Sequence, residues 1–544
     1  MWATPGSEHD LDGTVLRLTC RASDLGGEGY LQGVPTDDDP TRHLSSGPLW
    51  RRSAERLAGS PAYAFGTLAE TVWDVVVVGG GLTGVTTALL LARAGCTVAL
   101  LEARELGSGT TGSSTAKVSL LQGTTISAVQ DATSEDTARA YVEANVEAQA
   151  WVSRYAEEHE VALQRRSAFT YASTNQGARS VHAEIEAARG AGLTVVWVDD
   201  TTLPFPVAGA AVLANQLQLD PRELLTAMAV DAEQHGAVLV QGVVAHAISG
   251  TGPVVVSTDA GEVRANRVVV ATNLPFVDRG GHFARAEPLR SYAMAYRTPR
   301  QAVDGMYLSA DQPSRSLRDV PDADGSLLLV GGNGHVTGRA GSPSARLAEL
   351  DRWTLDWFPE ARLVHQWSAQ DYRTSSHVPW AGPLLPRHDE VLVAGGYGKW
   401  GMTNAVAAAL ALTARILGGH VAWAEELYAW GRPTPAAVAQ TMRLNAKVAG
   451  EMALGWAKPL ARPHRAEPDE GEGVVVADRL GTPTATARVN GKVHRVSAVC
   501  PHLGGILRWN DAERSWDCPL HGSRFTAAGG RLEGPATCGL RVRS

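Results

Sequence analysis

The chain has 544 residues, which is too long for one hydrophobic core and, at about 150 residues per domain, indicates about three units. With 44% hydrophobic and 19% charged residues its composition is that of a globular protein, which excludes a disordered or fibrous chain. The net charge of −8, with arginines scattered along the chain, argues against a nucleic-acid or anionic-membrane partner.

The N-terminal region carries no targeting signal that we can identify. Residues 1–45 show no sustained helical or strand period and are expected to form a disordered tail. The first residues lack the basic and then apolar layout of a signal peptide, and the chain has only five cysteines, so a cytoplasmic location is expected. The apolar stretches 75–101 and 404–418 are interrupted by charges, and no transmembrane segment is predicted.

A β-α-β pattern opens the main domain. A valine-rich strand at 74–78 is followed by a glycine turn, a helical run from Leu82 to Ala94, and a second strand at 97–103. Segments 267–273 and 390–396 have the composition of further buried parallel strands. The pattern predicts an α/β domain of Rossmann-like, glutathione-reductase type.

The remaining segments predict two further units. Alternating strands at about 160–215 and 285–375 predict a discontinuous α+β substrate domain, and helices are expected at 402–418 and 433–452. After a linker near residue 468, Asn490-Gly491 between alternating strands predicts a hairpin in a small all-β unit. The expected domains are a tail at 1–45, an oxidoreductase at 46–435, a helix and linker at 436–468, and the all-β unit at 469–544.

The all-β unit contains two matched pairs of metal ligands. Cys500-Pro501-His502 and Cys518-Pro519-Leu520-His521 each offer one thiolate and one imidazole. A structural zinc held by two cysteines and two histidines is one reading, because these ligands suit zinc equally well. However, CPHLGG and CPLHGSRF resemble the ligand loops of Rieske proteins in sequence and in spacing. The resemblance implies a [2Fe–2S] cluster with Cys500 and Cys518 on one iron and His502 and His521 on the other.

The ligand loops depart from those of the high-potential respiratory Rieske proteins. Gly505 and Leu520 stand where those proteins carry a cysteine pair that staples the loops. Ser523 is kept where the family donates a hydrogen bond to a bridging sulfur, but Phe525 replaces a tyrosine that donates to a ligand sulfur. We therefore expect a low to intermediate reduction potential. Gly534-Pro535-Ala536 resembles the proline loop that covers the cluster.

The glycine turn after the first strand matches the dinucleotide-binding fingerprint. Gly79 allows the tight turn, Gly81 allows close approach to a pyrophosphate, and Gly84 allows the helix and strand to pack closely. Glu102, at the end of the second strand, is placed to accept hydrogen bonds from the adenosine ribose. FAD and NAD share this fingerprint, so it does not choose between them.

Two further segments favour FAD. The loop that begins at Ala103 and Arg104 and runs to Gly123, and the later element GGYGKWGMTN (395–404), resemble flavin-binding segments of the D-amino-acid oxidase and glycine oxidase superfamily. This resemblance covers about residues 72–430, and fusion to a Rieske domain resembles a bacterial subgroup. It implies that these further residues contact FAD: Ser114, Thr115, Ala116, Val244, Ala271, Thr272, Gly398, Trp400, Gly401, Met402 and Thr403. Lys117 and Lys399 fall in the same segments, where a cation could stabilise a reduced anionic flavin. A role at the solvated surface is the alternative for both lysines.

The resemblance implies oxidation of a carbon–nitrogen bond by hydride transfer to FAD. Asp371 stands where amino-acid oxidases place the arginine that binds the substrate carboxylate, and an aspartate there would attract a cationic amine. Asp371, Arg373 and Lys117 are therefore the candidate catalytic residues. A purely structural role for Asp371 is the alternative.

The two predicted cofactors indicate a direction of electron flow. A Rieske cluster carries one electron and FAD accepts two, so we expect a dehydrogenase that passes single electrons to a carrier such as a ferredoxin. A reductase or oxygenase component that receives electrons through the cluster is one alternative. A non-catalytic electron-transfer or redox-sensing flavoprotein is another.

Overall fold

The computed structural model of the chain describes residues 45–46, 48–50, 65–322, 325–428, 434–460, 467–477 and 481–543. The predicted tail, residues 1–45, lies outside these ranges except for Ser45, which begins the short strand β1 (Ser45–Ser46). Among the helices of the described ranges, none is long and apolar enough to cross a membrane.

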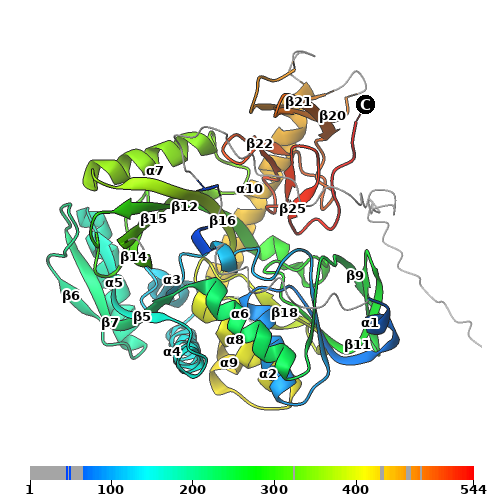
Figure 1. The fold of residues 1–544 in the computed structure, drawn as a ribbon, viewed down its shortest axis with the longest axis horizontal. Coiled ribbons are helices and arrows are strands. Elements are labelled where there is room, and N and C mark those ends of the chain that lie inside the picture. The colour runs from blue at the N-terminus through cyan, green and yellow to red at the C-terminus, as the bar shows by residue number, and fades with distance from the viewer. Residues whose placement is uncertain are drawn as a thin grey trace, which may run out of the picture.

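A largely parallel sheet forms the centre of the α/β unit (Figure 1). Its strands lie in the order β17–β18–β11–β2–β3–β8, and β18, β11, β2, β3 and β8 are mutually parallel. The strands are β2 (Val72–Val78), β3 (Val98–Glu102), β8 (Val238–Gln241), β9 (Ala245–Ser249), β10 (Val254–Thr258), β11 (Gly261–Val270), β17 (Trp380–Leu385) and β18 (His388–Gly395). The four segments predicted as parallel strands are confirmed as neighbours in this sheet.

Both faces of the central strands are buried, which explains their continuous runs of valine and leucine. Alternate residues of a strand point to opposite faces, so Val75 and Val77 pack in the core with the helices, whereas Val76 and Val78 pack in the core with β9 and β10. The helices of the first core include α2 (Leu82–Arg93), α6 (Pro221–Gln234) and α8 (Gly401–Ile416). This arrangement places the start of α2 at the carboxyl end of β2.

A second, mixed sheet is built from distant parts of the chain, as predicted. Its order is β1–β16–β12–β15–β14–β13–β5–β7–β4, with β6 paired to β7. The strands are β4 (Lys117–Val118), β5 (Leu163–Ala172), β6 (Val196–Val198), β7 (Gly209–Leu219), β12 (Ala286–Thr298), β13 (Met306–Ser309), β14 (Arg315–Asp322), β15 (Gly325–Val336) and β16 (Arg362–Thr374). The pairing of β4 with this sheet was not predicted.

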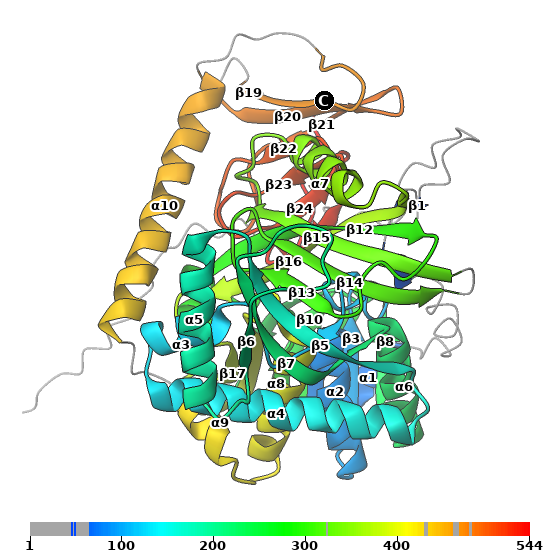
Figure 2. The same cartoon turned by 90° about the vertical axis from the view of Figure 1, so that its left-hand side faces the viewer.

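The other helices surround these two sheets. They are α1 (Phe65–Glu70), α3 (Thr125–Ala132), α4 (Glu135–Glu158), α5 (Asn175–Gly190), α7 (Pro343–Trp357) and α9 (Ala422–Leu427), with short 3-10 turns η3 (Thr111–Ser113), η4 (Arg279–Gly281) and η5 (Phe283–Arg285). Figure 2 shows α10 (Pro435–Leu460) running along the outside of the molecule to the C-terminal unit. The predicted helix 433–452 is thus longer than expected.

The C-terminal unit consists of two small antiparallel sheets, which confirms its all-β class. One contains β19 (Gly473–Ala477), β20 (Pro483–Val489) and β21 (Lys492–Ser497), and the other contains β22 (Arg508–Asn510), β23 (Ser515–Asp517), β24 (Arg524–Thr526) and β25 (Arg531–Glu533). Asn490 and Gly491 join β20 to β21 with φ of 53° and 71°, the positive values of the predicted hairpin turn.

Candidate functional site

The glycine turn packs tightly between β2 and α2. A Cβ atom on Gly84 would lie 1.9 Å from the Gly79 carbonyl oxygen, and one on Gly79 would lie 2.7 Å from the Ala271 carbonyl oxygen. Gly81 is the N-cap residue of α2 and provides no side-chain hydrogen bond to the helix. The first turn of α2 therefore presents backbone N–H groups and the positive end of the helix dipole, which suits a pyrophosphate.

Residues beyond the glycine turn extend this site. Glu102 accepts hydrogen bonds from the backbone N–H groups of Gly80 (2.7 Å) and Arg104 (2.9 Å), so its carboxylate is fixed beside the turn. Thr111 Oγ1 accepts from the Leu82 N–H (3.0 Å), and Thr110 donates to the Gln370 carbonyl oxygen (2.5 Å). The segment after β3 thus connects the glycine turn to strand β16.

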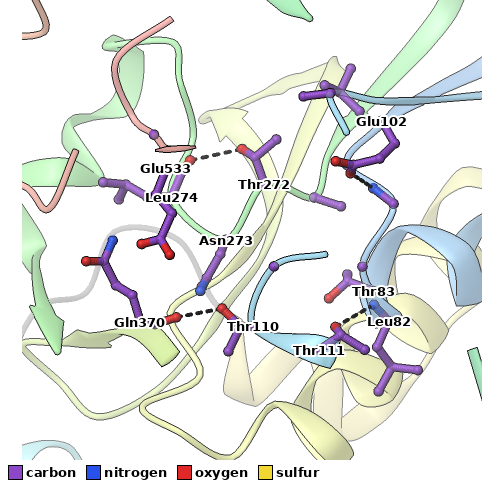
Figure 3. A pocket seen from close by; sticks show the side chains of 18 of the residues that line it. Leu82, Thr83, Glu102, Thr110, Thr111, Thr272, Asn273, Leu274, Gln370 and Glu533 are labelled. Atoms are coloured by element: carbon purple, nitrogen blue, oxygen red, sulfur yellow. Dashed lines mark hydrogen bonds between the residues drawn. The ribbon is translucent and has the colours of Figure 1, made fainter. Parts of the chain in front are cut away.

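One cavity is lined both by the glycine turn and by the C-terminal unit, and we call it the central cavity. Figure 3 shows Glu102 on one side of it and Leu274, Gln370 and Glu533 on the other. Its lining includes residues 78–83, 101–104, 107, 109–111, 114, 243–245, 271–274, 276, 370–372, 397, 399, 401–402, 405 and 531–535. The last five residues belong to the C-terminal unit, so two units wall one cavity.

Most of the predicted FAD contacts line the central cavity. They are Gly79, Gly81, Glu102, Ala103, Arg104, Ser114, Val244, Ala271, Thr272, Gly401 and Met402. Six predicted residues do not line it: Gly84, which packs against the glycine turn, and Thr115, Ala116, Gly398, Trp400 and Thr403. Arg318 donates hydrogen bonds to the carbonyl oxygens of Thr115 and Ala116, which holds that segment in the second sheet.

Asp371 lines the cavity but is engaged by the protein itself. Its carboxylate accepts hydrogen bonds from Asn273 Nδ2 (2.7 Å) and from the backbone N–H groups of Tyr372 (2.8 Å) and Lys399 (2.5 Å). Burial raises the pKa of Asp371. An amine in the cavity would have to share this carboxylate with three donors, and the contacts themselves tie β16 to the loop that carries Lys399.

The three cationic candidates differ in position. Lys399 lines the cavity, and burial followed by repulsion from Arg373 lowers the pKa of Lys399 to about 8. Arg373 does not line it, and its guanidinium pairs with Glu287 (2.9 Å). Lys117 does not line it either: its ammonium donates to the Tyr307 carbonyl oxygen (3.0 Å), and burial lowers its pKa to about 7. The fold therefore does not bring Lys117 and Arg373 together with Asp371 at the cavity wall.

The two predicted ligand loops of the C-terminal unit are built alike. Cys500 donates its backbone N–H to the Gly505 carbonyl oxygen and accepts from Gly504, and Cys518 does the same with Ser523 and Gly522. Both thiols are buried, and the His502 and His521 rings lie 5.1 Å apart between centroids at an interplanar angle of 86°. The loops thus bring all four predicted ligands together.

His521 presents a free ring nitrogen of the kind that a cluster ligand requires. Nδ1 of His521 is buried without a hydrogen-bond partner, and burial, with the neighbouring His502, lowers the pKa of His521 to about 3, so its ring is neutral. The Cys500 and Cys518 thiols lie in contact with each other beside this imidazole pair. Two thiolates and two neutral imidazoles are the donor set of a Rieske-type centre of two irons, with two protein ligands on each iron.

The departures from the respiratory pattern have clear structural counterparts. The Leu520 side chain fills the space beside Gly505, where an added Cβ would lie 2.6 Å from Leu520 Cδ1, so the two residues pack together in place of a disulfide. The Ser523 hydroxyl lies by the Cys500 thiol and accepts a hydrogen bond from the Ala536 N–H (3.0 Å). Phe525 is fully buried and offers no hydroxyl.

A buried charge network joins the C-terminal unit to β12. Arg290 is 1% exposed and donates to both oxygens of Glu513 (2.7 and 3.1 Å) and to Glu533 (3.2 Å). Arg524 donates to the same two carboxylates from the other side. Although burial by itself disfavours these charges, the paired guanidiniums and carboxylates stabilise one another at short range.

The histidine ligands face the α/β unit rather than solvent. His502 Nε2 lies 2.8 Å from Asp278 Oδ1, and the Phe283 ring meets both histidine rings edge to face, at 5.8 and 5.2 Å between centroids. Asp278 and Phe283 follow β11, the strand that also supplies cavity residues 271–274 at its end. The ligand edge and the central cavity are therefore neighbours.

Comparison with known families agrees with this geometry. The model of the DAO family, described as FAD dependent oxidoreductase, matches residues 74–415. The chain belongs to this family of FAD-dependent oxidoreductases. The Rieske [2Fe–2S] domain model matches residues 460–542, so the protein also carries a Rieske domain. It binds FAD and a [2Fe–2S] cluster. The central cavity, which most of the predicted FAD contacts line, is hereafter called the FAD cavity.

Individual relatives cover one or both parts. A putative Rieske 2Fe–2S iron–sulfur protein of Bacillus subtilis, YhfW, is 32% identical over 90% of this chain and 95% of its own length. A cytochrome b6-f complex iron–sulfur subunit of Synechococcus is 36% identical over 14% of this chain and 59% of that subunit. Glycine oxidase from Geobacillus kaustophilus has a TM-score of 0.56 at 20% identity, covering 66% of this chain and 98% of that one. L-proline dehydrogenase from P. horikoshii has a TM-score of 0.54 at 20% identity, with 66% and 96% covered.

Several cavity residues were not predicted from the sequence. Thr110, Asn273, Gln370 and Tyr397 line the FAD cavity, as do residues 531–535 of the Rieske domain. The proline of the last segment was assigned only to the cluster. Its resemblance to the loop that covers the cluster could have indicated this position. A loop on the outside of the cluster also contacts any domain that packs against the cluster.

Proposed function

We propose that the protein oxidises a carbon–nitrogen bond of an amine or amino-acid-like substrate and passes the electrons one at a time through its Rieske cluster to an external carrier. Bound FAD supplies hydride acceptance, and the cluster supplies one-electron transfer. The observation that carries the proposal is the shared cavity, whose walls include both the glycine turn and residues 531–535 of the Rieske domain. Because the FAD and cluster domains wall the same cavity, electron transfer between the two cofactors within one chain is favoured.

The polar groups around the FAD cavity support binding of a small polar substrate. Lys399 and Asp371 both line the cavity, and the Lys399 backbone N–H donates to the Asp371 carboxylate, so the wall carries one residue of each charge. We propose that Asp371 positions the Lys399 loop and contributes negative charge toward a cationic amine, and that Lys399 places its positive charge beside the flavin. Arg373 and Lys117, which lie off the cavity, have no part in this proposal.

A dehydrogenase is favoured over an oxidase because the cluster gives the electrons a route other than oxygen. The glycine oxidase and the L-proline dehydrogenase that share the fold act on amino acids by name, which supports carbon–nitrogen oxidation as the reaction class. The substrate loses a hydride and a proton to give an imine, which water hydrolyses. Two successive one-electron transfers through the cluster then return the enzyme to its starting state.

The test is anaerobic addition of a panel of amines and amino acids to the holoenzyme, with flavin absorbance and the cluster EPR signal followed together. Bleaching of the flavin followed by appearance of the reduced-cluster signal is expected for at least one compound. If no compound bleaches the flavin whereas a reduced ferredoxin does, electrons enter through the cluster and the protein is a reductase component. Asp371→Asn should weaken turnover of the active amine while leaving the cluster spectrum unchanged.

A further inference from the structure

Strand β16 lies between the two redox sites, and its two faces contact different domains. Side chains alternate along a strand, so even-numbered and odd-numbered residues point in opposite directions. Ser368, Gln370 and Tyr372 hydrogen-bond to Glu513, Gly522 and His521 of the Rieske domain. The odd-numbered Trp367 and Asp371 instead hydrogen-bond to Ser113 and Asn273 of the α/β domain. One strand is therefore in contact with both cofactor sites.

Tyr372 makes the most direct contact with the cluster. Its hydroxyl lies 3.1 Å from the carbonyl oxygen of the ligand His521 and 3.3 Å from that of Gly534 in the proline loop. Gln370 Nε2 donates to the same hydroxyl (3.1 Å), which leaves the hydroxyl proton free for these carbonyls. Tyr372 is 5% exposed, so this hydroxyl and its partners are buried at the contact between the two domains.

The same residue belongs to the wall of the FAD cavity. Residues 370–372 all line the cavity, and the Asp371 carboxylate accepts the Tyr372 backbone N–H while holding the Lys399 loop. A path from the cavity to the cluster ligand thus needs only the Tyr372 residue and one hydrogen bond.

Close backbone packing fixes this contact. A Cβ atom on Gly522 would lie 2.6 Å from Pro288 Cβ, and one on Gly338 would lie 2.8 Å from the backbone nitrogen of Pro519. Arg339 donates to the Pro519 carbonyl oxygen at 2.8 Å. The second ligand loop therefore rests directly on β12, β16 and the turn after β15, which leaves no room for a water layer at these points.

We propose that Tyr372 is the positioning residue that couples the flavin to the Rieske cluster, by holding the His521 loop against the wall of the FAD cavity. The inference rests on the proposed function in that electrons pass between the two centres. The step forms and breaks no covalent bond: the reduced cofactor in the cavity loses one electron, and the oxidised cluster gains it. Because tunnelling falls steeply with separation, a loosened His521 loop slows the step without altering either cofactor.

Tyr372→Phe in the holoenzyme isolates the hydroxyl, because the ring and its packing remain. Flavin is reduced anaerobically by a light pulse with an external photoreductant, and reduction of the cluster is followed by absorbance and EPR. We expect cluster reduction to slow by about tenfold, since the buried His521 carbonyl loses its hydrogen-bond donor and the loop is held less closely against the cavity wall. FAD content, the cluster EPR spectrum and both midpoint potentials should stay unchanged.

Tyr307→Phe is the matched control. Tyr307 is also a buried tyrosine of the second sheet, but its hydroxyl bonds to Thr202 and Asp304, away from the Rieske domain. It should leave cluster reduction unchanged. Because light replaces the substrate, the result is independent of whether any amine is oxidised.

An unaltered rate of cluster reduction in Tyr372→Phe, with both cofactors present, would overturn the proposal. Should Tyr372→Phe lose its cluster, Gln370→Leu serves instead, since it removes the donors to Tyr372 Oη and to the Gly522 carbonyl oxygen while keeping the tyrosine. Slower cluster reduction in Gln370→Leu supports the coupling, and a wild-type rate refutes it.

Discussion

The two ends of the FAD cavity are built in different ways. The nucleotide end comes from one continuous stretch, in which the glycine turn, Glu102 and Thr111 follow one another between β2 and η3. The other end is assembled from β16, the end of β11, the Lys399 loop and residues 531–535 of the Rieske domain. The Rieske ligand loops resemble the first kind, since each is a short continuous motif.

This difference predicts two kinds of response to mutation. In a continuous motif each residue has one position and one task, so its loss removes a cofactor outright. At the end assembled from distant segments, several side chains contribute to each contact. A single substitution there should therefore weaken the contact between the domains, or change a cofactor's midpoint potential, by a small amount. The predictions below test that division, beginning with the largest effect.

Replacement of a cluster ligand should abolish the cluster. In Cys518→Ser the thiolate is lost from a buried position, and the iron content and the Rieske EPR signal should fall to background, with FAD retained. Cys96→Ser is the control, because Cys96 is a free cysteine outside the ligand loops. A Cys518→Ser protein that kept a normal Rieske signal would remove this residue from the ligand set.

Gly84→Ala should strongly weaken FAD binding. The added Cβ would lie 1.9 Å from the Gly79 carbonyl oxygen, and such overpacking costs about 1–3 kcal/mol, which is about 5-fold to 150-fold in affinity. The dissociation constant follows from flavin fluorescence on reconstitution. Gly190→Ala in helix α5, where a Cβ meets no atom within 4 Å, should bind FAD normally. Equal affinities for the two variants would contradict the assigned packing.

Arg290→Met should loosen the Rieske domain without removing either cofactor. It removes the buried ion pairs of Arg290 with Glu513 and Glu533. We expect the free energy of unfolding to fall by about 3 kcal/mol and no more, because Arg524 still pairs with both carboxylates. Thermal unfolding and limited proteolysis measure the effect. Arg297→Met in the same strand removes a more exposed pair with Asp322 and should cost less than about 1 kcal/mol. Identical stability of both variants would show that the network does not hold the domains.

The flavin potential should depend on the charge of Lys399. Its pKa of about 8 means that the ammonium is charged below pH 8 and neutral above it, so its support for an anionic reduced flavin is lost as the pH rises through 8. We expect an extra fall in the midpoint potential above that pH, worth about 1–2 kcal/mol, or about 20–45 mV for two electrons. Spectroelectrochemical titration measures it. Lys399→Met should lack the inflection, and its persistence there would assign it elsewhere.

Asp278→Asn should have the smallest effect. The Asp278 side chain is 50% exposed, so its interaction with His502 is screened by water and is worth at most about 1 kcal/mol. Loss of the negative charge makes reduction of the cluster easier, and the midpoint potential should rise by about 10–40 mV at constant pH. EPR-monitored redox titration detects a shift of this size. A downward shift would mean that the carboxylate does not act through the ligand.

The same division explains what could be predicted from the sequence. The strands of the parallel sheet, the glycine turn and the four ligand positions follow from local patterns, because adjacent residues determine them. The contacts of Tyr372 and Gln370 with the Rieske domain could not be predicted, since they depend on how distant segments pack. A position within a cofactor-binding motif does not by itself place a side chain at the cofactor. Lys117 lies in a flavin-binding segment, yet its side chain points into the second sheet and donates a hydrogen bond to the Tyr307 carbonyl oxygen. Of Lys117, Arg373 and Lys399, only Lys399 lines the cavity.

The packing of Leu520 against Gly505 leaves the second ligand loop without a covalent fastening of its own. Three carbonyl oxygens of that loop, those of Pro519, His521 and Gly522, are instead held by Arg339, Tyr372 and Gln370 of the neighbouring domain. Contact with the neighbouring domain thereby fixes the ligand loop, as a disulfide does in the respiratory proteins. The iron content retained in mild denaturant should therefore report whether the two domains remain in contact. We expect the cluster absorbance to be lost at a lower denaturant concentration than the one at which either domain unfolds.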